Sequence, residues 1–356
     1  MGLLRKTSAS LRYGTATATQ SGGMDQLLRN PAIVNGLRKV ESRVARLSGS
    51  SALPGINAGA SRVINSGGKR LRPALTLATA MALGKTPDRR VITAAACVEL
   101  IHAGSLVHDD LMDRATERRG AATLNSDLGD GKALVIGDFM LARAGLAAIT
   151  SVSRPVAEVL AATVVELAEG QYLETTDLFN PRRTEASALR SITGKTAALF
   201  RASCLVAAVC AQASPEDRAR MAAYGERFGL IFQILDDLLD LTATSEQLGK
   251  PAGNDLKQGV YSLPLILSKA NFLTNGDISL QRGISDEQVA AILAQLRQTT
   301  MVETTIEYCR GLAAEALAAL PEIGDHEIAG ILRSLPTAYI NTIIRTINRP
   351  ALTSTS

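Results

Sequence analysis

Two stretches of the chain decide its fold: RVITAAACVELIHAGSLVHDDLMD at Arg90–Asp113 and RMAAYGERFGLIFQILDDLLDL at Arg220–Leu241. In both, apolar residues recur at steps of three and four, which indicates an α-helix. The same spacing continues from about Asp25 to Arg349, and no alternating strand pattern interrupts it. The sequence therefore predicts an all-α protein, a single large bundle of roughly ten helices. Two small helical domains joined near residue 180 or 215 are the alternative.

The composition agrees with a helical bundle. Hydrophobic residues make up 46% of the 356 residues and aromatic residues only 3%, with no Trp, so the core must consist of Ala, Leu, Val and Ile. Such a core favours close-packed helices over a β-sandwich. The net charge of +4, without a Lys/Arg block, does not indicate nucleic-acid binding. Four cysteines without a C-x-x-C pair indicate buried thiols in a reducing compartment.

The ends of the chain differ from its middle. Residues 1–24 contain no acid and are rich in Ser, Thr, Ala and Gly, so we expect a flexible leader before a domain at 25–350 and a tail at 351–356. An organelle-targeting peptide is the alternative for the leader. No stretch reaches the roughly 18 uncharged apolar residues of a membrane span, so we expect no transmembrane segment and a cytoplasmic protein.

Two copies of D-D-x-x-D, at Asp109–Asp113 and Asp236–Asp240, are the most informative motif. On a helix the first and last Asp of each copy lie on the same side, one turn apart. Two carboxylates so placed can share a hard divalent cation such as Mg²⁺ and leave coordination sites for phosphate oxygens. The candidate ligands are Asp109, Asp110, Asp113, Asp236, Asp237 and Asp240.

One such cluster on an exposed helix is usually a solvated face. Here each copy ends a strongly apolar run, where unpaired acids are costly to bury. The polar stripe also continues upstream at helical steps, to Ser105 and His102 before the first cluster and to Gln233 before the second. These stripes predict a shared internal cavity that holds metal ions and phosphate.

A basic counterpart lies at Gly67–Pro73, GGKRLRP, with the cations Lys69, Arg70 and Arg72 at the entry to a predicted helix. Glycines let backbone amides approach an anion, and Pro suits the first helical turn. The pair Arg118-Arg119 follows the first aspartate cluster. Arginine offers a fork that matches phosphate oxygens, although each basic motif alone would be read as surface residues.

Taken together, the motifs resemble those of the trans-isoprenyl diphosphate synthases, or polyprenyl synthetases. They are GGKRLRP, HDDLMDRATERRG, GKT, FQILDDLLD and GKPAGNDLKQG, in the family's order between residues 67 and 259. The resemblance implies a helical bundle with a deep central cavity and a homodimer. It also implies an enzyme that condenses isopentenyl diphosphate with an allylic diphosphate and uses Mg²⁺, with three ions in the substrate complex.

The resemblance also implies a role for each matching residue. Lys69, Arg72, His102 and Arg119 would hold isopentenyl diphosphate; Arg118, Lys195, Thr196 and Gln233 would line the allylic site; and Lys250 would lie near the second aspartate cluster. The residues expected to matter most for catalysis are Asp109, Asp113, Asp236 and Lys195. Many members carry a lysine where this chain has Val260, a departure that weakens ionisation of the allylic diphosphate unless Lys257 or Lys250 compensates.

Product length depends on the helix that carries Asp109. Ile101, Gly104 and Ser105 precede the cluster, and none of them is the bulky aromatic that short-chain members typically place here. We therefore expect a geranylgeranyl or longer product, with a long chain for a quinone side chain favoured. The alternative is that Gly104 only allows two helices to pack closely.

Other functions are weighed against this one. A class I terpene cyclase shares the bundle and the first aspartate cluster but usually lacks the second cluster and the Lys/Arg set. A non-catalytic subunit of a heteromeric synthase tends to lose the aspartates, and a helical lipid carrier gives no reason for paired acids. The expected partners are isopentenyl diphosphate, an allylic diphosphate and a second copy of the chain; peripheral membrane contact for product release is left open.

Overall fold

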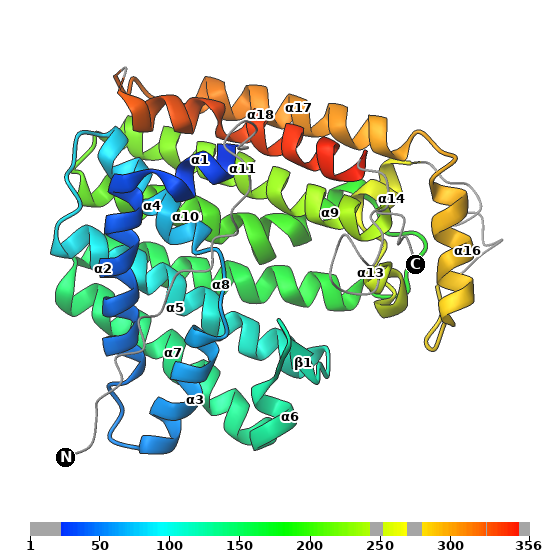
Figure 1. Cartoon of the computed structure of the whole chain (residues 1–356), viewed down its shortest axis with the longest axis horizontal. Helices are drawn as coiled ribbons and strands as arrows, with labels where there is room; N and C mark the ends of the chain where they lie inside the picture. Colours follow the sequence, from blue (N-terminus) through cyan, green and yellow to red (C-terminus); the bar gives the residue numbers. More distant parts are fainter. Residues whose placement is uncertain (1–22, 243–251, 269–279, 325, 349–356) are drawn as a thin grey trace, which may run out of the picture.

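The protein is described from a computed structural model, which places residues 23–242, 252–268, 280–324 and 326–348. Almost every described element is a helix (Figure 1). The α-helices are α1 (Gly23–Arg29), α2 (Pro31–Ser48), α3 (Pro54–Asn65), α4 (Leu71–Ala82), α5 (Arg89–Met112), α6 (Leu124–Leu128), α7 (Asp130–Ser151), α8 (Arg154–Thr176), α9 (Glu185–Ile192), α10 (Ala198–Cys210), α11 (Pro215–Thr242), α13 (Asn254–Gln258), α14 (Leu263–Leu267), α16 (Asp286–Leu296), α17 (Met301–Ala319) and α18 (Glu327–Ile347). A π-helical turn, η1 (Thr193–Ala197), joins α9 to α10, and β1 (Glu117–Arg118) pairs antiparallel with β2 (Ala121–Ala122).

The two stretches that predicted the fold form the long helices α5 and α11. The side chain of Asp88 caps α5 by accepting the backbone N–H groups of Arg90 and Val91 at 2.9 and 3.0 Å. Such a cap satisfies donors that have no partner inside the helix. The all-α prediction is confirmed. The two-residue strands of the hairpin are too short to leave an alternating pattern in the sequence.

The helices pack in layers around α5, α8, α10 and α11 (Figure 1). In this view α17 and α18 cover the central helices from above, α3, α6, α7 and the hairpin lie below, and α2 crosses one end. The buried side chains form one continuous cluster that extends from Met24 on α1 to Ile343 on α18.

A small aromatic group links three of these helices. The rings of Phe200 on α10 and Phe228 on α11 meet edge to face at 5.6 Å, and Phe232 stacks on Tyr339 of α18 at 5.5 Å. Aromatic pairs in these geometries add stability beyond the area they bury. The group fixes α11 against α10 and α18 beside the cavity described below.

The helix α8 crosses η1 at backbone contact. A Cβ atom on Gly170 would lie 2.2 Å from the backbone nitrogen of Lys195, and one on Gly194 would lie 2.7 Å from the carbonyl oxygen of Glu166. Only glycine fits at such a crossing. Because η1 carries Lys195 and Thr196, this contact sets where both side chains lie; π-helical turns are often found at functional sites.

Two expectations about the chain need correction or comment. Gly23 and Met24 fall in the predicted leader, but both belong to α1 and are buried; residues 1–22 lie outside the described part. Three helical stretches, Arg89–Met112, Asp130–Ser151 and Glu185–Cys210, are long and apolar enough to cross a membrane by length and composition alone. The bundle buries 78% and 67% of the first and third, and only 39% of the second. The expectation of no transmembrane segment stays a prediction.

Candidate active site

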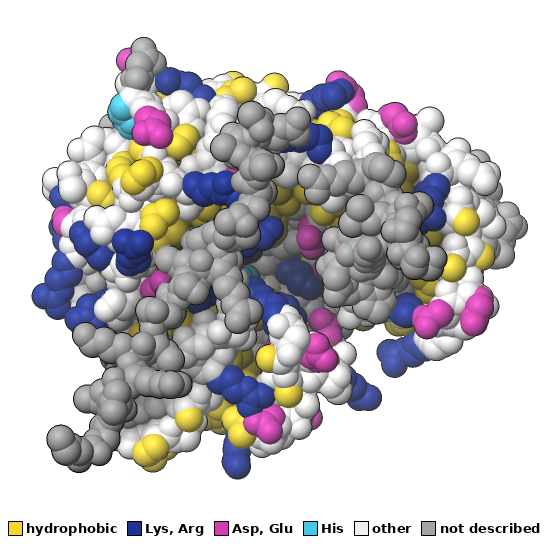
Figure 2. All heavy atoms as spheres, viewed as in Figure 1, with side chains coloured by type: hydrophobic (Ala, Val, Ile, Leu, Met, Phe, Trp, Pro, Cys, Tyr) yellow, Lys and Arg dark blue, Asp and Glu magenta, His cyan; other side chains and the backbone are white. Residues whose placement is uncertain are grey.

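Two cavities are lined by residues of both α5 and α11. The basic cavity, of about 520 Å³, is lined by four cations, Lys69, Arg70, Arg72 and Arg119, against three acids, Asp25, Glu99 and Asp236. The acidic cavity, of about 200 Å³, is lined by five acids, Asp109, Asp113, Glu174, Asp237 and Asp255, against three cations, Arg118, Arg183 and Lys195. Figure 2 shows Lys and Arg side chains inside a recess near the middle of the molecule, with acidic side chains beside it.

Neighbouring residues are divided between the two cavities. Arg118 lines the acidic cavity and Arg119 the basic one, and Asp237 and Asp236 are divided in the same way. The left-handed backbone of Arg119, at φ 56°, lets the chain turn between the two arginines. The predicted residues are therefore brought together, but in two groups.

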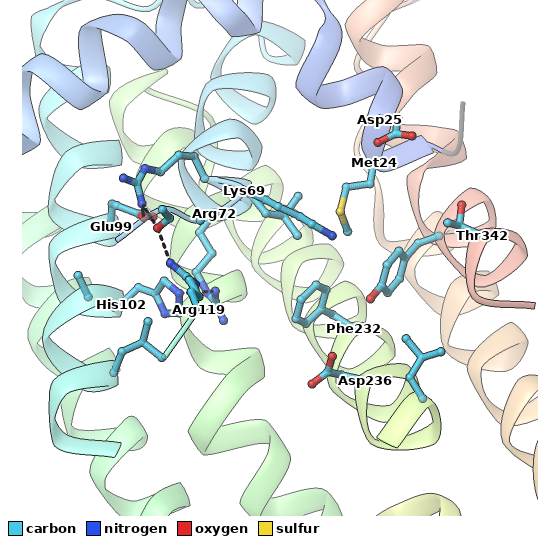
Figure 3. Close-up of a pocket in the computed structure, with 18 of the residues that line it drawn as sticks. Met24, Asp25, Lys69, Arg72, Glu99, His102, Arg119, Phe232, Asp236 and Thr342 are labelled. Carbon is cyan, nitrogen blue, oxygen red and sulfur yellow. Dashed lines mark hydrogen bonds and ion pairs between the residues drawn. The ribbon is translucent and has the colours of Figure 1, made fainter. Parts of the chain in front are cut away.

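The basic motif forms one wall of the basic cavity (Figure 3). Arg70 is already engaged within the protein, because Glu99 pairs with it at 2.8 Å and the carbonyl of Ile64 accepts from it at 2.6 Å. Lys69, in contrast, makes no ion pair with a described residue and extends across the cavity toward Met24. The carbonyl of Gly67 accepts from Arg119.

Arg72 and His102 lie together in this cavity. Nη1 of Arg72 is 3.4 Å from Nε2 of His102, and its guanidinium lies over the ring of Phe200 at 4.5 Å. Burial lowers the pKa of Arg72 to about 10, with Glu99 acting in the opposite direction. Burial and the neighbouring arginines hold the pKa of His102 well below its usual value, so the ring is neutral and Nε2 can accept from Arg72.

The first aspartate cluster borders the acidic cavity through Asp109 and Asp113. Burial raises the pKa of both carboxyls, and each is close to other acids. Asp110 points elsewhere: Nε of Arg118 donates to it at 2.6 Å, and it lines a separate surface pocket. Asp110 therefore orients Arg118 in this arrangement.

The second cluster is ordered by a chain of hydrogen bonds. Thr196 donates to Gln233 at 2.8 Å, and Gln233 donates to Asp237 at 2.7 Å. Burial and the nearby Asp255 raise the pKa of Asp237 well above its usual value. Asp240 is buried outside both cavities, where it accepts the backbone N–H of Asp255 at 3.0 Å.

Lys195 lies in the acidic cavity close to acids of two helices, Glu174 of α8 and Asp109 of α5. It pairs with Glu174 of α8. Burial alone would lower its pKa, but Glu174 and Asp109 raise it above the usual value. Lys195 thus stays charged beside the first aspartate cluster.

The acid excess fits divalent cations in the acidic cavity. Five carboxylates against three cations would repel one another unless further positive charge were bound. Within the described ranges no three acid, His or Cys side chains are already gathered as a complete metal site. An incomplete ligand set is what Mg²⁺ tolerates when substrate oxygens supply the rest.

The residues predicted to set product length line neither of the two cavities. A Cβ on Gly104 would come 3.2 Å from the carbonyl oxygen of Gly137 and from Leu141, so the close-packing alternative fits Gly104. Ile101 is buried in the core, and the hydroxyl of Ser105 donates to the carbonyl of His102 at 2.9 Å. Lys250 lies outside the described residues, and Val260 lines the acidic cavity.

Several cavity residues were not found from the sequence. Glu99 lies three residues before His102, so one further helical step along the polar stripe would have found it. Glu174, Arg183 and Asp255 come from segments far apart in the chain, and only the fold brings them together.

Comparisons with known proteins place the chain among polyprenyl synthetases. Residues 54–296 match the family model described as polyprenyl synthetase. The chain is 33% identical over 270 residues to octaprenyl diphosphate synthase of Escherichia coli K12, covering 74% of this chain and 82% of that protein. A decaprenyl diphosphate synthase structure from Rhodobacter capsulatus superimposes with a TM-score of 0.81 at 30% identity, covering 90% of this chain and 99% of that one. A polyprenyl synthase from Caulobacter crescentus CB15, complexed with calcium and isoprenyl diphosphate, gives 0.79 at 29% identity, covering 94% and 100%.

Proposed function

The chain belongs to the polyprenyl synthetase family, and we propose that its two cavities divide the two substrates of a trans-prenyltransferase between them. The enzyme condenses isopentenyl diphosphate with an allylic diphosphate to give a medium- to long-chain polyprenyl diphosphate. Isopentenyl diphosphate binds in the basic cavity and the allylic diphosphate in the acidic one. The observation that carries this assignment is the opposite charge balance of the two linings.

The basic cavity can bind a diphosphate with side chains alone. Lys69 and Arg72 supply a point charge and a planar fork, and Arg119 closes the same wall. The neutral His102 holds the Arg72 guanidinium without competing for the anion. Phe232, one turn before Asp236 on α11, forms an apolar part of the cavity wall (Figure 3).

The acidic cavity suits the departure of a diphosphate. Mg²⁺, for which we propose three ions, would supply Lewis-acid neutralisation of the diphosphate when bound to carboxylates of this cavity such as Asp109, Asp113 and Asp237. Lys195 and Arg118 place positive charge where the leaving group gains negative charge. Thr196 and Gln233 add polar groups in fixed positions. The structure with calcium and isoprenyl diphosphate from Caulobacter crescentus supports a divalent cation in this family.

The reaction balances without a side-chain base. The allylic C–O bond breaks, and its electron pair leaves with the diphosphate. The π electrons of isopentenyl diphosphate then form the new C–C bond to the allylic carbon. The resulting cation loses a proton to the released diphosphate, which yields an allylic product five carbons longer. The enclosed site keeps water from the cation.

We also propose a homodimer and a cytoplasmic location. Exposed apolar side chains gather on the adjacent helices α7 and α8, including Leu146 and Ile149, each 49% exposed, and Val165, 57% exposed. Such a face marks an interaction site, with a membrane surface as the other candidate. Light scattering of the purified chain should give twice the chain mass, and Ile149→Asp should give the monomer mass.

Incubation of the purified chain with Mg²⁺, labelled isopentenyl diphosphate and primers of graded length tests the proposed function. We expect chromatography to reveal products of geranylgeranyl length or longer, in keeping with a quinone side chain. A cyclised hydrocarbon would indicate a terpene cyclase, and no consumption of isopentenyl diphosphate would indicate a non-catalytic subunit. The complete aspartate and Lys/Arg sets favour neither alternative.

A further inference from the structure

A buried arginine lies in the wall of the acidic cavity, outside every motif singled out from the sequence. Arg183 belongs to the loop between α8 and α9, is 7% exposed and lines the cavity together with Val260. Arginine is rarely buried unless paired, because removing its charge from water is costly. Its position therefore calls for an explanation.

The contacts of Arg183 use only part of its guanidinium. Nε lies 3.3 Å from Oδ2 of Asp177, and Nη1 donates to the carbonyl of Tyr261 at 3.1 Å. Asp177 itself accepts hydrogen bonds from Ser187 and Asn180. These hydrogen bonds and the charge of Arg183 outweigh the effect of burial and lower the pKa of Asp177. Nη2 has no partner among the described residues. A guanidinium has five N–H donors, so donors remain available for an anion.

The same loop is anchored on both sides of Val260. The N–H of Phe179 donates to the carbonyl of Gly259 at 2.7 Å, and Arg183 donates to that of Tyr261. Gly259 has φ 82°, and a Cβ there would lie 2.4 Å from the Phe179 ring. The two anchor points fix Arg183 relative to Val260. The helices α9 and α14, which follow these two segments, pack together at the same end of the bundle (Figure 1).

Val260 supplies no charge at a position where the resemblance to the family leads to the expectation of a lysine. Lys257, which the sequence offers as a substitute, pairs with Asp286 and does not line the acidic cavity. Arg183 lies in that cavity with unused donors. We infer that Arg183 binds the allylic diphosphate and provides, from the loop between α8 and α9, the positive charge that Val260 cannot provide.

This inference rests on the proposed function. Its consequence is that Arg183 and residue 260 are interchangeable sources of one charge. A purely structural Arg183, needed only to hold the loop, would not be replaceable by a lysine at position 260. The guanidinium stays protonated throughout and stabilises the negative charge of the departing diphosphate.

Steady-state kinetics on four proteins test the inference: the unchanged enzyme, Arg183→Gln, the double variant Arg183→Gln with Val260→Lys, and Arg182→Gln. Arg182 is the adjacent exposed arginine and lines neither cavity, so it controls for loss of charge in the loop. We expect Arg183→Gln to raise the KM for the allylic diphosphate by about 10- to 100-fold, the range for a lost hydrogen bond to a charged group. The KM for isopentenyl diphosphate should change less than about threefold, and the double variant should recover most of the loss.

The outcomes are separable. If the unchanged enzyme does not consume isopentenyl diphosphate, the proposed function fails. If it does and Arg183→Gln keeps its KM for the allylic substrate, or loses affinity for both substrates without rescue by lysine at 260, the inference is overturned. Should Arg183→Gln not fold, Arg183→Met combined with Asp177→Asn removes both charges of the pair, which proteins tolerate better than one unpaired buried charge. The same KM pattern and rescue are then required.

Discussion

The basic and acidic cavities share two helices, α5 and α11, yet their linings carry opposite charge, and the proposed assignment of one substrate to each rests on this difference. Both take residues from α5 and α11, and consecutive residues such as Arg118 and Arg119 are divided between them. The basic cavity carries enough side-chain cations to bind a diphosphate that stays intact. The acidic cavity carries excess carboxylate, which becomes favourable only with added cations, and this suits the substrate whose diphosphate must leave.

The comparison predicts the largest loss for the acidic cavity. Asp109→Ala should lower kcat by about a thousandfold or more. The substitution removes a carboxylate that would hold Mg²⁺ beside the leaving diphosphate. Incorporation of labelled isopentenyl diphosphate measures the loss, and circular dichroism should show unchanged helix content. Glu303→Ala, which removes an exposed acid on α17, is the matched control and should retain full activity. Activity within tenfold of the unchanged enzyme in Asp109→Ala would contradict the assignment.

A second change disturbs the acidic cavity through its backbone. Gly170→Ala would push a Cβ against the backbone nitrogen of Lys195, so we expect a loss of about 1–3 kcal/mol in the free energy of unfolding. The KM for the allylic substrate should rise with it. Gly311→Ala, at a helical glycine with open space around it, should instead stabilise by about 0.5–1 kcal/mol. Equal effects of the two substitutions in urea unfolding would argue against a tight crossing of α8 and η1.

A substitution of Lys69, which lines the basic cavity, should change the KM of only one of the two substrates. Lys69→Gln removes an exposed cation that has no ion pair among the described residues, so the fold should not change. We expect the KM for isopentenyl diphosphate to rise by about tenfold and the KM for the allylic primer to stay within about twofold. The opposite pattern would reverse the assignment of the two cavities.

Site residues could be predicted from the sequence where they belong to a contiguous motif, and not where only the fold brings them together. The aspartate clusters and GGKRLRP are contiguous, and helical periodicity correctly places Asp109 and Asp113 in one cavity. It does not account for the second cluster, where Asp236 and Asp237 line different cavities and Asp240 lines neither. Glu174 and Arg183 have no such signal, because only the packing of α8 and the following loop brings them to the cavity. Asp255 lies within GKPAGNDLKQG, but the motif alone does not show that its side chain lines the cavity. The division of Arg118 from Arg119 depends on one left-handed residue and could not be read from the sequence.

Gly104 illustrates the same limit. The sequence identifies a small residue five positions before Asp109 but does not say which neighbour it faces. The structure places α7 against it, at Gly137 and Leu141. The role of Ser105 in product length stays a prediction.

The smallest expected effect concerns these two residues. Gly104→Ala should destabilise the fold by about 1 kcal/mol and leave product length unchanged, because the added methyl meets α7. Ser105→Phe should shorten the product if the growing chain passes this turn of α5. Chromatography of the products measures both effects. A shorter product from Gly104→Ala would support the expectation from the sequence that Gly104 helps to set product length.

The central claim is that isopentenyl diphosphate binds in the basic cavity and the allylic diphosphate in the acidic one. Binding of each substrate in the presence and absence of Mg²⁺ tests this assignment most directly. Isothermal titration calorimetry would use isopentenyl diphosphate alone and, separately, an unreactive thio analogue of the allylic diphosphate, each with Mg²⁺ and again with EDTA. We predict that EDTA changes the Kd for isopentenyl diphosphate by less than about threefold and weakens the allylic analogue by about a hundredfold or more. Equal dependence of both ligands on Mg²⁺, or dependence of isopentenyl diphosphate alone, would contradict the account.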